Sequence, residues 1–258
     1  MKTVILCGGQ GTRLREETEY RPKPLVEVGE RPILWHIMKN YAHFGFDDFV
    51  LCLGYRGSMI KDYFLNFRAQ THDFSLHLGD NSSLQILDDT QADDFHVLCA
   101  DTGLNTMTGG RLKRVQKYLD PKEPFFLTYG DGLSDVDIQR TLDFHREHGR
   151  AATVTIVRAP SRFGTVSWDE SGRVTRFVEK PMQDSWVSAG FFVLEPSVLD
   201  LIIDDATIWE RSPLETLAAQ GELMAYRHNG MFLAIDTYRE YLLLNEAWRR
   251  GETPWKVW

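Results

Sequence analysis

The run Val4–Leu14 reads Val-Ile-Leu-Cys-Gly-Gly-Gln-Gly-Thr-Arg-Leu, so a short apolar segment leads directly into a glycine-rich turn. A buried strand that ends in such a turn lets backbone N–H groups close around an anion. Arg13, at the end of the turn, and Lys23, in Pro22-Lys23-Pro24, add two cations of different reach. Together these residues predict a site for the phosphates of a nucleoside triphosphate.

The glycine pattern differs from both common phosphate-binding loops. It has no Gly-Lys-Ser/Thr ending, as a P-loop has, and its Gly-Gly-x-Gly spacing misses the dinucleotide-binding fingerprint. The alternative interpretation is a glycine-rich hairpin, because glycine patterns alone are weak signals. Arg13 and the Pro-Lys-Pro element favour the phosphate site, since a hairpin needs neither.

The composition is that of an ordinary globular protein, with 258 residues of which 43% are hydrophobic and 26% charged. The formal net charge of −8 argues against a nucleic-acid backbone or an anionic membrane as the main partner. No signal peptide precedes the first strand and no apolar run approaches about 18 residues, so we expect a cytoplasmic protein. Cys7, Cys52 and Cys99 lie in or beside apolar runs, which predicts buried, reduced thiols.

Apolar runs alternate with helical patterns along the first 157 residues. Strands are predicted near 3–7, 48–53, 95–100, 124–129 and 152–157, and helices near 32–44, 57–67, 109–118 and 135–147. This alternation is typical of an α/β fold with a Rossmann-like, mostly parallel sheet covered by helices on both faces. Ligands of such sheets collect at the carboxyl ends of the strands, which is where Gly8, Asp101 and Asp131 fall.

The pattern changes after residue 157. Two strand-like segments within 164–178 flank an Asp- and Gly-containing turn, which predicts a β-hairpin. Further strands are predicted near 187–194, 222–227 and 231–235, and helices near 196–204, 212–220 and 237–250. We expect one domain, 1–258, with a nucleotide-binding core in 1–157, an insert near 70–95, and an acceptor-binding part with the C-terminal helix in 158–258.

Two aspartates stand at predicted strand ends. Asp131 lies between Gly130 and Gly132, and Asp236 follows an apolar run directly before the last helix. Each has an ordinary structural interpretation, a turn for Asp131 and a helix N-cap for Asp236. Carboxylates that point into a crevice also suit Mg²⁺, which takes few protein oxygens and keeps phosphate and water ligands.

Two further cations have a sequence context that suits anion or base binding. Pro181 biases Lys180 to an extended backbone, so this lysine could hold a second phosphate; a solvated charge pair is the alternative. Gly109-Gly110 lets the backbone approach a flat ligand, and Arg111 offers a planar donor fork to a base edge. The alternative for Arg111 is an ordinary helix start, although cations are disfavoured there.

Histidines and tryptophans are given structural roles only. The eight histidines show no metal-ligand spacing, so none is predicted to ligate a metal or to act in catalysis. Trp248, Trp255 and Trp258 are predicted to pack the C-terminal tail onto the body or onto a neighbouring subunit.

Several motifs together resemble the sugar-phosphate nucleotidylyltransferases over essentially the whole chain, and the match is nearest to the glucose-1-phosphate cytidylyltransferases that make CDP-glucose. The motifs are the Gly8–Arg13 loop, Pro22-Lys23-Pro24, residues 33–38, Asp101-Thr102-Gly103, residues 107–114, Thr128–Gly132, Glu179-Lys180-Pro181 and Pro254-Trp255-Lys256. The Met-Thr-Gly-Gly-Arg stretch at 107–111 is the part that separates the cytidylyl branch from the others.

The resemblance implies a role for each matching position. The nucleotide CTP would be bound by Leu6, Gly8, Gly9, Gly11, Thr12, Arg13, Lys23, Thr106, Gly110, Arg111, Gly130 and Asp131. Thr106 and Arg111 would recognise cytosine, Asp131 and Asp236 would hold Mg²⁺, and Glu179, Lys180, Ser188 and Gly190 would bind the phosphorylated acceptor. Arg13, Lys23, Asp131 and Lys180 would be the catalytic residues.

The implied reaction is attack by an acceptor phosphate oxygen on the α-phosphorus of CTP, with pyrophosphate leaving. The nucleophile is already ionised, so positioning and charge neutralisation are the main requirements. The family also implies a homo-oligomer, a trimer or a hexamer.

Departures from the family pattern leave the acceptor open. Ser188-Ala189 stands where the family usually has Asn-Gly, and 165–167 and 231–235 also differ. A lost amide changes hydrogen bonding to sugar hydroxyls, so α-D-glucose 1-phosphate, another hexose or heptose phosphate, or a non-sugar phosphate could be the acceptor. UTP or dTTP in place of CTP, or a non-catalytic nucleotide sensor on the same fold, are further alternatives.

Overall fold

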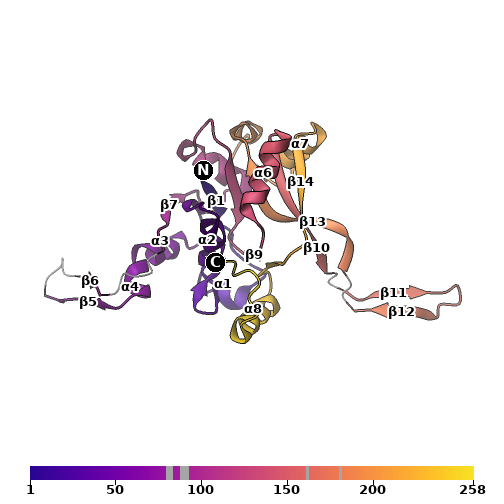
Figure 1. The fold of residues 1–258 in the computed structure, drawn as a ribbon, viewed down its shortest axis with the longest axis horizontal. Helices are drawn as coiled ribbons and strands as arrows, with labels where there is room; N and C mark the ends of the chain where they lie inside the picture. The colour runs from indigo at the N-terminus through magenta and orange to yellow at the C-terminus, as the bar shows by residue number, and fades with distance from the viewer. Residues whose placement is uncertain (80–83, 88–92, 161–162, 180–181) are drawn as a thin grey trace.

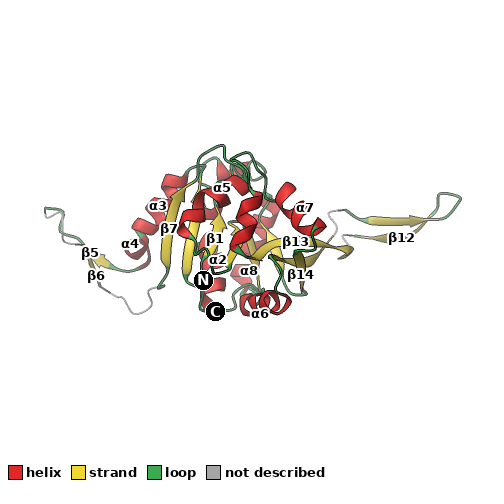
Figure 2. Ribbon diagram, turned by 90° about the horizontal axis from the view of Figure 1, so that it is seen from above, coloured by secondary structure: helices red, strands yellow, loops and turns green. Residues whose placement is uncertain are grey.

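A seven-stranded sheet forms the centre of the molecule, in the strand order β14-β10-β13-β8-β1-β4-β7 (Figure 2). The computed structural model describes residues 1–79, 84–87, 93–160, 163–179 and 182–258. The sheet strands are β1 (Thr3–Leu6), β4 (Asp48–Leu53), β7 (His96–Asp101), β8 (Phe125–Tyr129), β10 (Ala152–Pro160), β13 (Met182–Leu194) and β14 (Leu223–His228).

The sheet is mixed, as predicted, with β13 as its antiparallel member. β13 runs antiparallel to both β8 and β10, whereas β1 pairs in parallel with β4 and β8, β4 with β7, and β10 with β14. The other six strands therefore end at the same edge of the sheet. That edge gathers the loops that follow β1, β4, β7 and β8, where a ligand site of an α/β sheet forms.

Alternate residues of the strands enter two separate cores. In β1, Ile5 faces a core shared with the helices α2 (Ile33–His43), α3 (Gly57–Leu65), α6 (Ile138–His148) and α8 (Tyr238–Arg250). Val4 and Leu6 face the other core, which is closed by α5 (Thr108–Val115), the 3₁₀ helix η3 (Pro196–Leu201) and α7 (Ser212–Ala219). Both faces of the sheet are thus covered, and its central strands are mostly apolar, with Thr3 and Thr128 as buried polar exceptions.

Short paired strands lie outside the main sheet. β9 (Gly132–Ser134) pairs with β15 (Phe232–Ala234), and β11 (Thr165–Trp168) with β12 (Val174–Val178). The hairpin of β11 and β12 extends from one end of the body, and β5 and β6 extend from the opposite end (Figure 1). The remaining elements are α1 (Arg15–Thr18), α4 (Phe67–Thr71), β2 (Glu27–Val28), β3 (Arg31–Pro32), β5 (Phe74–Ser75), β6 (Gln85–Ile86), and the 3₁₀ helices η1 (Lys23–Leu25) and η2 (Gln116–Tyr118).

The predicted elements are confirmed in type and approximate place, with three differences. The helix expected near 196–204 is a shorter 3₁₀ helix, and the strand expected at 187–194 begins at Met182. The helix expected near 109–118 is α-helical only to Val115 and ends in a 3₁₀ turn. The strand expected at 231–235 is confirmed, and it pairs with β9 outside the main sheet. Among the described residues, no helix combines the length and the apolar character needed to cross a bilayer.

The expectation of buried cysteines is confirmed for Cys7 and Cys52 but not for Cys99. All three are free, with Cys7 and Cys52 buried and Cys99 half-buried. Burial raises the pKa of the Cys52 thiol to about 12 and raises the pKa of Cys7 as well. A neutral, buried thiol is a poor nucleophile.

The C-terminal tryptophans pack onto the body around His36, as predicted for the tail. The imidazole centroid of His36 lies 5.4 Å from the ring of Trp248, 6.4 Å from Trp255 and 6.0 Å from Trp258. Nε2 of His36 lies 2.9 Å from the carbonyl oxygen of Val28, to which it donates. Burial in this apolar nest lowers the pKa of His36 to about 4.

This buried imidazole predicts an acid-labile contribution to stability. An unfolded chain takes up a proton at His36 near pH 6.5, whereas the folded protein keeps the ring neutral down to about pH 4. The free energy of unfolding should therefore fall by about 3 kcal/mol from this site between pH 7 and pH 4. Urea denaturation over that range, with His36→Gln as a non-titrating variant that keeps a donor, measures it. Equal pH dependence in both proteins would contradict the prediction.

Candidate active site

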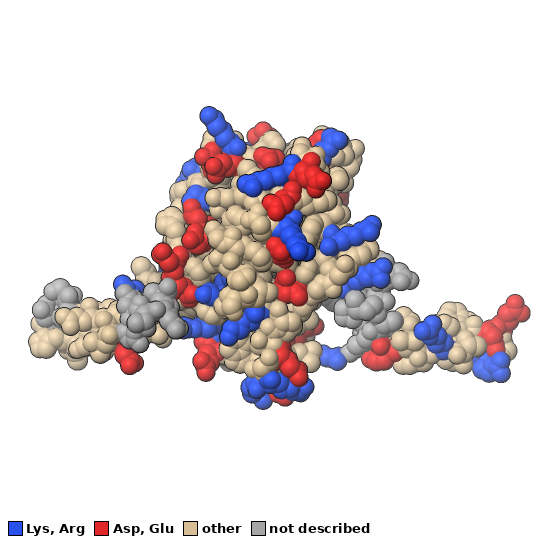
Figure 3. Space-filling view, in the orientation of Figure 1, with Lys and Arg blue, Asp and Glu red and all other residues tan. Residues whose placement is uncertain are grey.

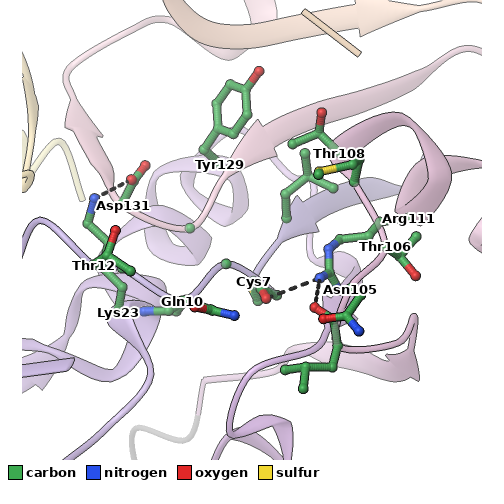
Figure 4. A pocket seen from close by; sticks show the side chains of 18 of the residues that line it. Cys7, Gln10, Thr12, Lys23, Asn105, Thr106, Thr108, Arg111, Tyr129 and Asp131 are labelled. Carbon is green, nitrogen blue, oxygen red and sulfur yellow. Dashed lines mark hydrogen bonds and ion pairs between the residues drawn. The ribbon is translucent and has the colours of Figure 1, made fainter. Parts of the chain in front are cut away.

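A cavity of about 610 Å³ opens at the edge of the sheet where β1, β7 and β8 end. Its walls are the glycine-rich turn after β1, the segment between β7 and α5, and the end of β8 (Figure 4). The lining residues are Leu6, Cys7, Gly8, Gly9, Gln10, Gly11, Thr12, Arg13, Lys23, Pro24, Leu104, Asn105, Thr106, Met107, Thr108, Arg111, Tyr129, Gly130 and Asp131. This volume is in the range of small-molecule sites.

The glycine-rich turn takes a conformation that a larger residue would oppose at Gly11. Gly11 has φ +62°, and a Cβ placed on it would lie 2.7 Å from Cγ2 of Thr18. The Thr18 hydroxyl lies 2.9 Å from the carbonyl oxygen of Gly11, to which it donates. Gly11 therefore lets the turn fold back against α1, so that Thr12 and Arg13 face the cavity.

Two carboxylates are brought together by the β9–β15 ribbon. Asp131 immediately precedes β9, and Asp236 lies two residues beyond β15. Ala234 is in register with Gly132, and the Ile235 N–H donates to the Asp131 carbonyl oxygen over 3.0 Å. The ribbon thus places two aspartates from distant parts of the chain close together: Asp131 lines the cavity, and Asp236 lies behind Lys23 and Arg13 without lining it.

Two cations bind these carboxylates. Nζ of Lys23 lies 2.6 Å from Oδ2 of Asp131 and 2.9 Å from Oδ1 of Asp236. Nη1 of Arg13 lies 2.7 Å from Oδ2 of Asp236. The four side chains for which the sequence predicts phosphate and metal binding therefore form one connected cluster, although they come from three separate segments.

The cluster fits a magnesium ion better than a metal held by protein alone. Within the described ranges of the chain, no group of three or more His, Cys, Asp or Glu side chains could surround a metal. Mg²⁺ commonly uses only one or two carboxylates, with phosphate oxygens and water completing its octahedron. Asp131 and Asp236 supply that number of hard oxygen ligands, next to a cavity of nucleotide size.

Arg111 is buried on the opposite side of the cavity and is bonded to protein oxygens (Figure 4). Its Nη1 lies 3.0 Å from the Leu53 carbonyl oxygen, 2.8 Å from that of Gly103 and 2.8 Å from the Thr102 hydroxyl. Its Nη2 lies 3.2 Å from the carbonyl oxygens of both Gly8 and Leu104. The guanidinium therefore ties together the loops that follow β1, β4 and β7.

The position of the Arg111 guanidinium explains why residue 8 is a glycine. A Cβ on Gly8 would lie 2.1 Å from Nη1 of Arg111, so the loop needs a glycine there to admit the guanidinium. Burial lowers the pKa of Arg111, which nevertheless remains charged. Donation from Arg111 to cytosine stays a prediction; the structure adds a role in joining three loops.

Tyr129 forms a wall of the cavity that the sequence did not single out. Its hydroxyl donates to Oε1 of Glu210, and the Thr108 hydroxyl donates to Oε2 of the same carboxylate over 2.6 Å. A Cβ on Gly190 would lie 2.4 Å from the Tyr129 ring, so the ring packs directly on that backbone. Burial and the Glu210 carboxylate raise the pKa of Tyr129, which keeps its phenol neutral.

The structure brings most of the predicted nucleotide residues to one place. All twelve except Gly110 line the cavity; Gly110 packs behind it, where a Cβ would lie 2.6 Å from Cα of Asp205. The predicted acceptor residues Glu179, Ser188 and Gly190 do not line this cavity. Lys180 lies outside the described residues.

Several lining residues were missed by sequence reasoning. Gln10, Pro24, Asn105 and Met107 lie inside or beside motifs that were recognised, so their proximity to a motif was the available signal. Glu210 sits in a loop before α7 with no motif around it, and no sequence signal could have placed it beside Tyr129.

Comparison with known proteins assigns this site to a class. A family model described as "Nucleotidyl transferase" matches residues 2–238. The chain belongs to the nucleotidyl transferase family, and it is a nucleotidyltransferase.

Within this family, the chain is similar over its full length to proteins named for one activity. It is 49% identical to the glucose-1-phosphate cytidylyltransferase of Salmonella typhi and 43% identical to the probable glucose-1-phosphate cytidylyltransferase of Bacillus subtilis. In both comparisons all of this chain and all of the relative are covered.

Solved structures agree on the fold. HddC from Yersinia pseudotuberculosis superposes with a TM-score of 0.66 at 22% identity, covering 96% of this chain and 99% of that one. An apo UDP-glucose pyrophosphorylase superposes with a TM-score of 0.69 at 15% identity, covering 97% of this chain and 98% of that one.

Proposed function

We propose that this protein transfers the cytidylyl group of CTP to α-D-glucose 1-phosphate, giving CDP-glucose and pyrophosphate. The observation that carries the proposal is the cluster of Arg13, Lys23, Asp131 and Asp236 at the rim of a nucleotide-sized cavity. The full-length similarity to glucose-1-phosphate cytidylyltransferases supports the choice of nucleotide and acceptor. The first 157 residues would bind the nucleotide, and the remainder would bind the acceptor.

Both reactants are anions and repel each other, and the cations of the cluster would reduce this repulsion. Backbone N–H groups of the Gly8–Arg13 loop would receive the triphosphate, with Lys23 and Arg13 as the nearest cations. An acceptor phosphate oxygen is already ionised, so holding it in line with the α-phosphorus needs no general base. Neutralising the departing pyrophosphate is the larger task for the protein.

Asp131 and Asp236, which both bind Lys23, would hold Mg²⁺. When bound, such an ion neutralises phosphate charge and steadies the leaving group. Lys23 now binds both of these carboxylates, so a phosphate that attracts Lys23 would release carboxylate oxygens at the same time.

The direct test is pyrophosphate release with CTP and Mg²⁺, run against UTP, dTTP and GTP. Release with CTP and α-D-glucose 1-phosphate at about 1 s⁻¹ or more is expected of an ordinary enzyme. A panel of other hexose, heptose and non-sugar phosphates completes the assay. If CTP released pyrophosphate with another acceptor but not with glucose 1-phosphate, the proposed acceptor would be wrong. If CTP released pyrophosphate with none of the acceptors, the proposed function would be wrong.

The two projecting arms support assembly into a homo-oligomer, a trimer or a hexamer. On the arm around β5 and β6, Leu78 is 90% exposed, and on the β11–β12 hairpin Trp168 is 70% exposed. The first arm shows mostly uncharged atoms in the space-filling view (Figure 3). Isolated two-stranded ribbons are marginally stable in water, so both arms would pack against other copies of this chain.

Charge on an arm should therefore disrupt the assembly. Trp168→Asp is expected to shift the wild-type oligomer to smaller species in size-exclusion chromatography with light scattering. Burying a new carboxylate without a partner is strongly unfavourable. Glu147→Arg, on the exposed surface of α6, serves as a charge-changing control that should leave the mass unaltered. A wild-type monomer, or an unchanged Trp168→Asp oligomer, would contradict the proposal.

A further inference from the structure

Arg56 has an unfavourable backbone conformation that calls for an explanation. It has φ 49° and ψ 32°, and in the described part of the chain it is the one non-glycine residue with positive φ. The left-handed region is unfavourable for a residue with a Cβ and natural for glycine. The chain has glycine at positions 54 and 57, yet it keeps an arginine between them.

The Arg56 side chain binds a short helix on the other side of a loop. Its Nη2 lies 2.7 Å from the carbonyl oxygen of Glu19, and its Nε lies 2.9 Å from the hydroxyl of Tyr55. That hydroxyl in turn donates to the carbonyl oxygen of Thr18 over 3.1 Å. Thr18 and Glu19 form the carboxyl end of α1, where carbonyls have no partner within the helix.

The end of α1 is connected to the glycine-rich turn through Thr18. The Thr18 hydroxyl lies 2.9 Å from the carbonyl oxygen of Gly11 and 2.8 Å from that of Leu14. α1 has only four residues, so its own hydrogen bonds give it little stability. The two carbonyl contacts from Tyr55 and Arg56 therefore help to hold Thr18, and through it Gly11, in place.

We infer that Tyr55 and Arg56 clamp α1 and thereby hold the Gly8–Arg13 loop in the conformation that receives a nucleoside triphosphate. Neither residue lines the cavity, so both are positioning residues. The strained backbone at position 56 is maintained because it directs the guanidinium onto α1. The inference rests on the proposed function only for the identity of the ligand.

Arg56→Gly separates this role from a role in folding. Glycine removes the guanidinium and accepts the left-handed backbone, so the melting temperature of the free protein should not fall. The loop, however, should populate its binding conformation less often, and a competent fraction reduced to about a tenth raises the Kd for Mg²⁺–CTP about tenfold. Saturating CTP should restore most of kcat, so the change appears in KM.

Two matched variants complete the design. Arg56→Lys retains a cation that can donate to the Glu19 carbonyl, and it should recover most of the CTP affinity. Tyr55→Phe removes one hydroxyl and should show an intermediate loss. Hydrogen exchange of the free proteins gives a readout without any ligand: amides at 14–21 should exchange faster in Arg56→Gly, while those of β8 should not.

The outcomes distinguish this inference from the proposed function. If the wild-type protein binds no CTP, the proposed function fails, and hydrogen exchange still tests the clamp. If Arg56→Gly exchanges and binds CTP as the wild type does, the clamp is wrong. A lower melting temperature in Arg56→Gly with an unchanged Kd would assign Arg56 to folding alone and would also overturn the inference.

Discussion

Replacing Asp131 with asparagine should lower the rate of cytidylyl transfer by about 10³-fold while leaving the protein folded. Asp131 binds Lys23, is placed beside Asp236 by the β9–β15 ribbon, and supplies one of two carboxylates that could ligate Mg²⁺. Asparagine keeps the size of the side chain but loses its charge. Steady-state pyrophosphate release at saturating CTP and acceptor measures the effect.

The fold should tolerate this change because Lys23 keeps Asp236 as a partner. Asp143→Asn, at an exposed position on α6, is the matched control and should retain full activity. If Asp131→Asn kept more than about a tenth of the wild-type turnover, less than 1.4 kcal/mol of transition-state stabilisation would depend on this carboxylate. The proposed role of the cluster would then be wrong.

Arg111→Leu should have the largest effect on stability among the residues of the site. The substitution removes the bonds that join three loops and leaves the carbonyl oxygens of Gly103 and Leu104 without the donor they have here, whereas those of Leu53 and Gly8 keep backbone donors. Each unsatisfied group costs about 1–3 kcal/mol. A loss of about 3 kcal/mol or more in the free energy of unfolding is therefore expected, together with loss of CTP binding. Urea denaturation and calorimetric titration with CTP measure the two effects.

Arg114→Leu provides a comparison within the same helix. Arg114 is an exposed arginine that pairs with Asp205 on the surface, so its replacement should have little effect on stability. If both variants lost the same stability, the bonds from Arg111 to the loops would contribute nothing beyond those of a surface arginine. Arg111→Lys, which keeps the charge but not the planar fork, should lie between the two.

Sequence reasoning succeeded where the signal was local. The turn after β1 and the aspartate after β8 were predicted because an apolar run and its adjacent glycines are neighbours in the chain. Parallel strands then bring these separate turns to one edge, so the cluster of Arg13, Lys23 and Asp131 follows from fold class and motif together.

Sequence reasoning failed where a structural feature depends on a contact between distant segments of the chain. The bonds from Arg111 go mostly to main-chain carbonyls, which every residue has, so no residue type marks them in advance. β15 was predicted as a strand, but β9 has only three residues, too few for an alternating pattern to reveal it or its pairing with β15. The position of Glu210 beside Tyr129 depends on how the loop before α7 returns to the sheet.

The pairing of Lys23 and Arg13 with Asp131 and Asp236 also has a consequence for what the empty protein attracts. Within this cluster, two positive and two negative side chains already compensate one another, so these four residues together present no surplus of either sign to solution. A polyanion that binds alone must draw Lys23 and Arg13 away from the two carboxylates, which are then left without these partners. A divalent ion that binds alone must draw the carboxylates away from Lys23 and Arg13, which are then left without these partners. A metal–phosphate complex carries both charges, so its anion can bind the two cations while its metal binds the two carboxylates. The protein should therefore bind the metal complexes of pyrophosphate and nucleotide in preference to the bare anions.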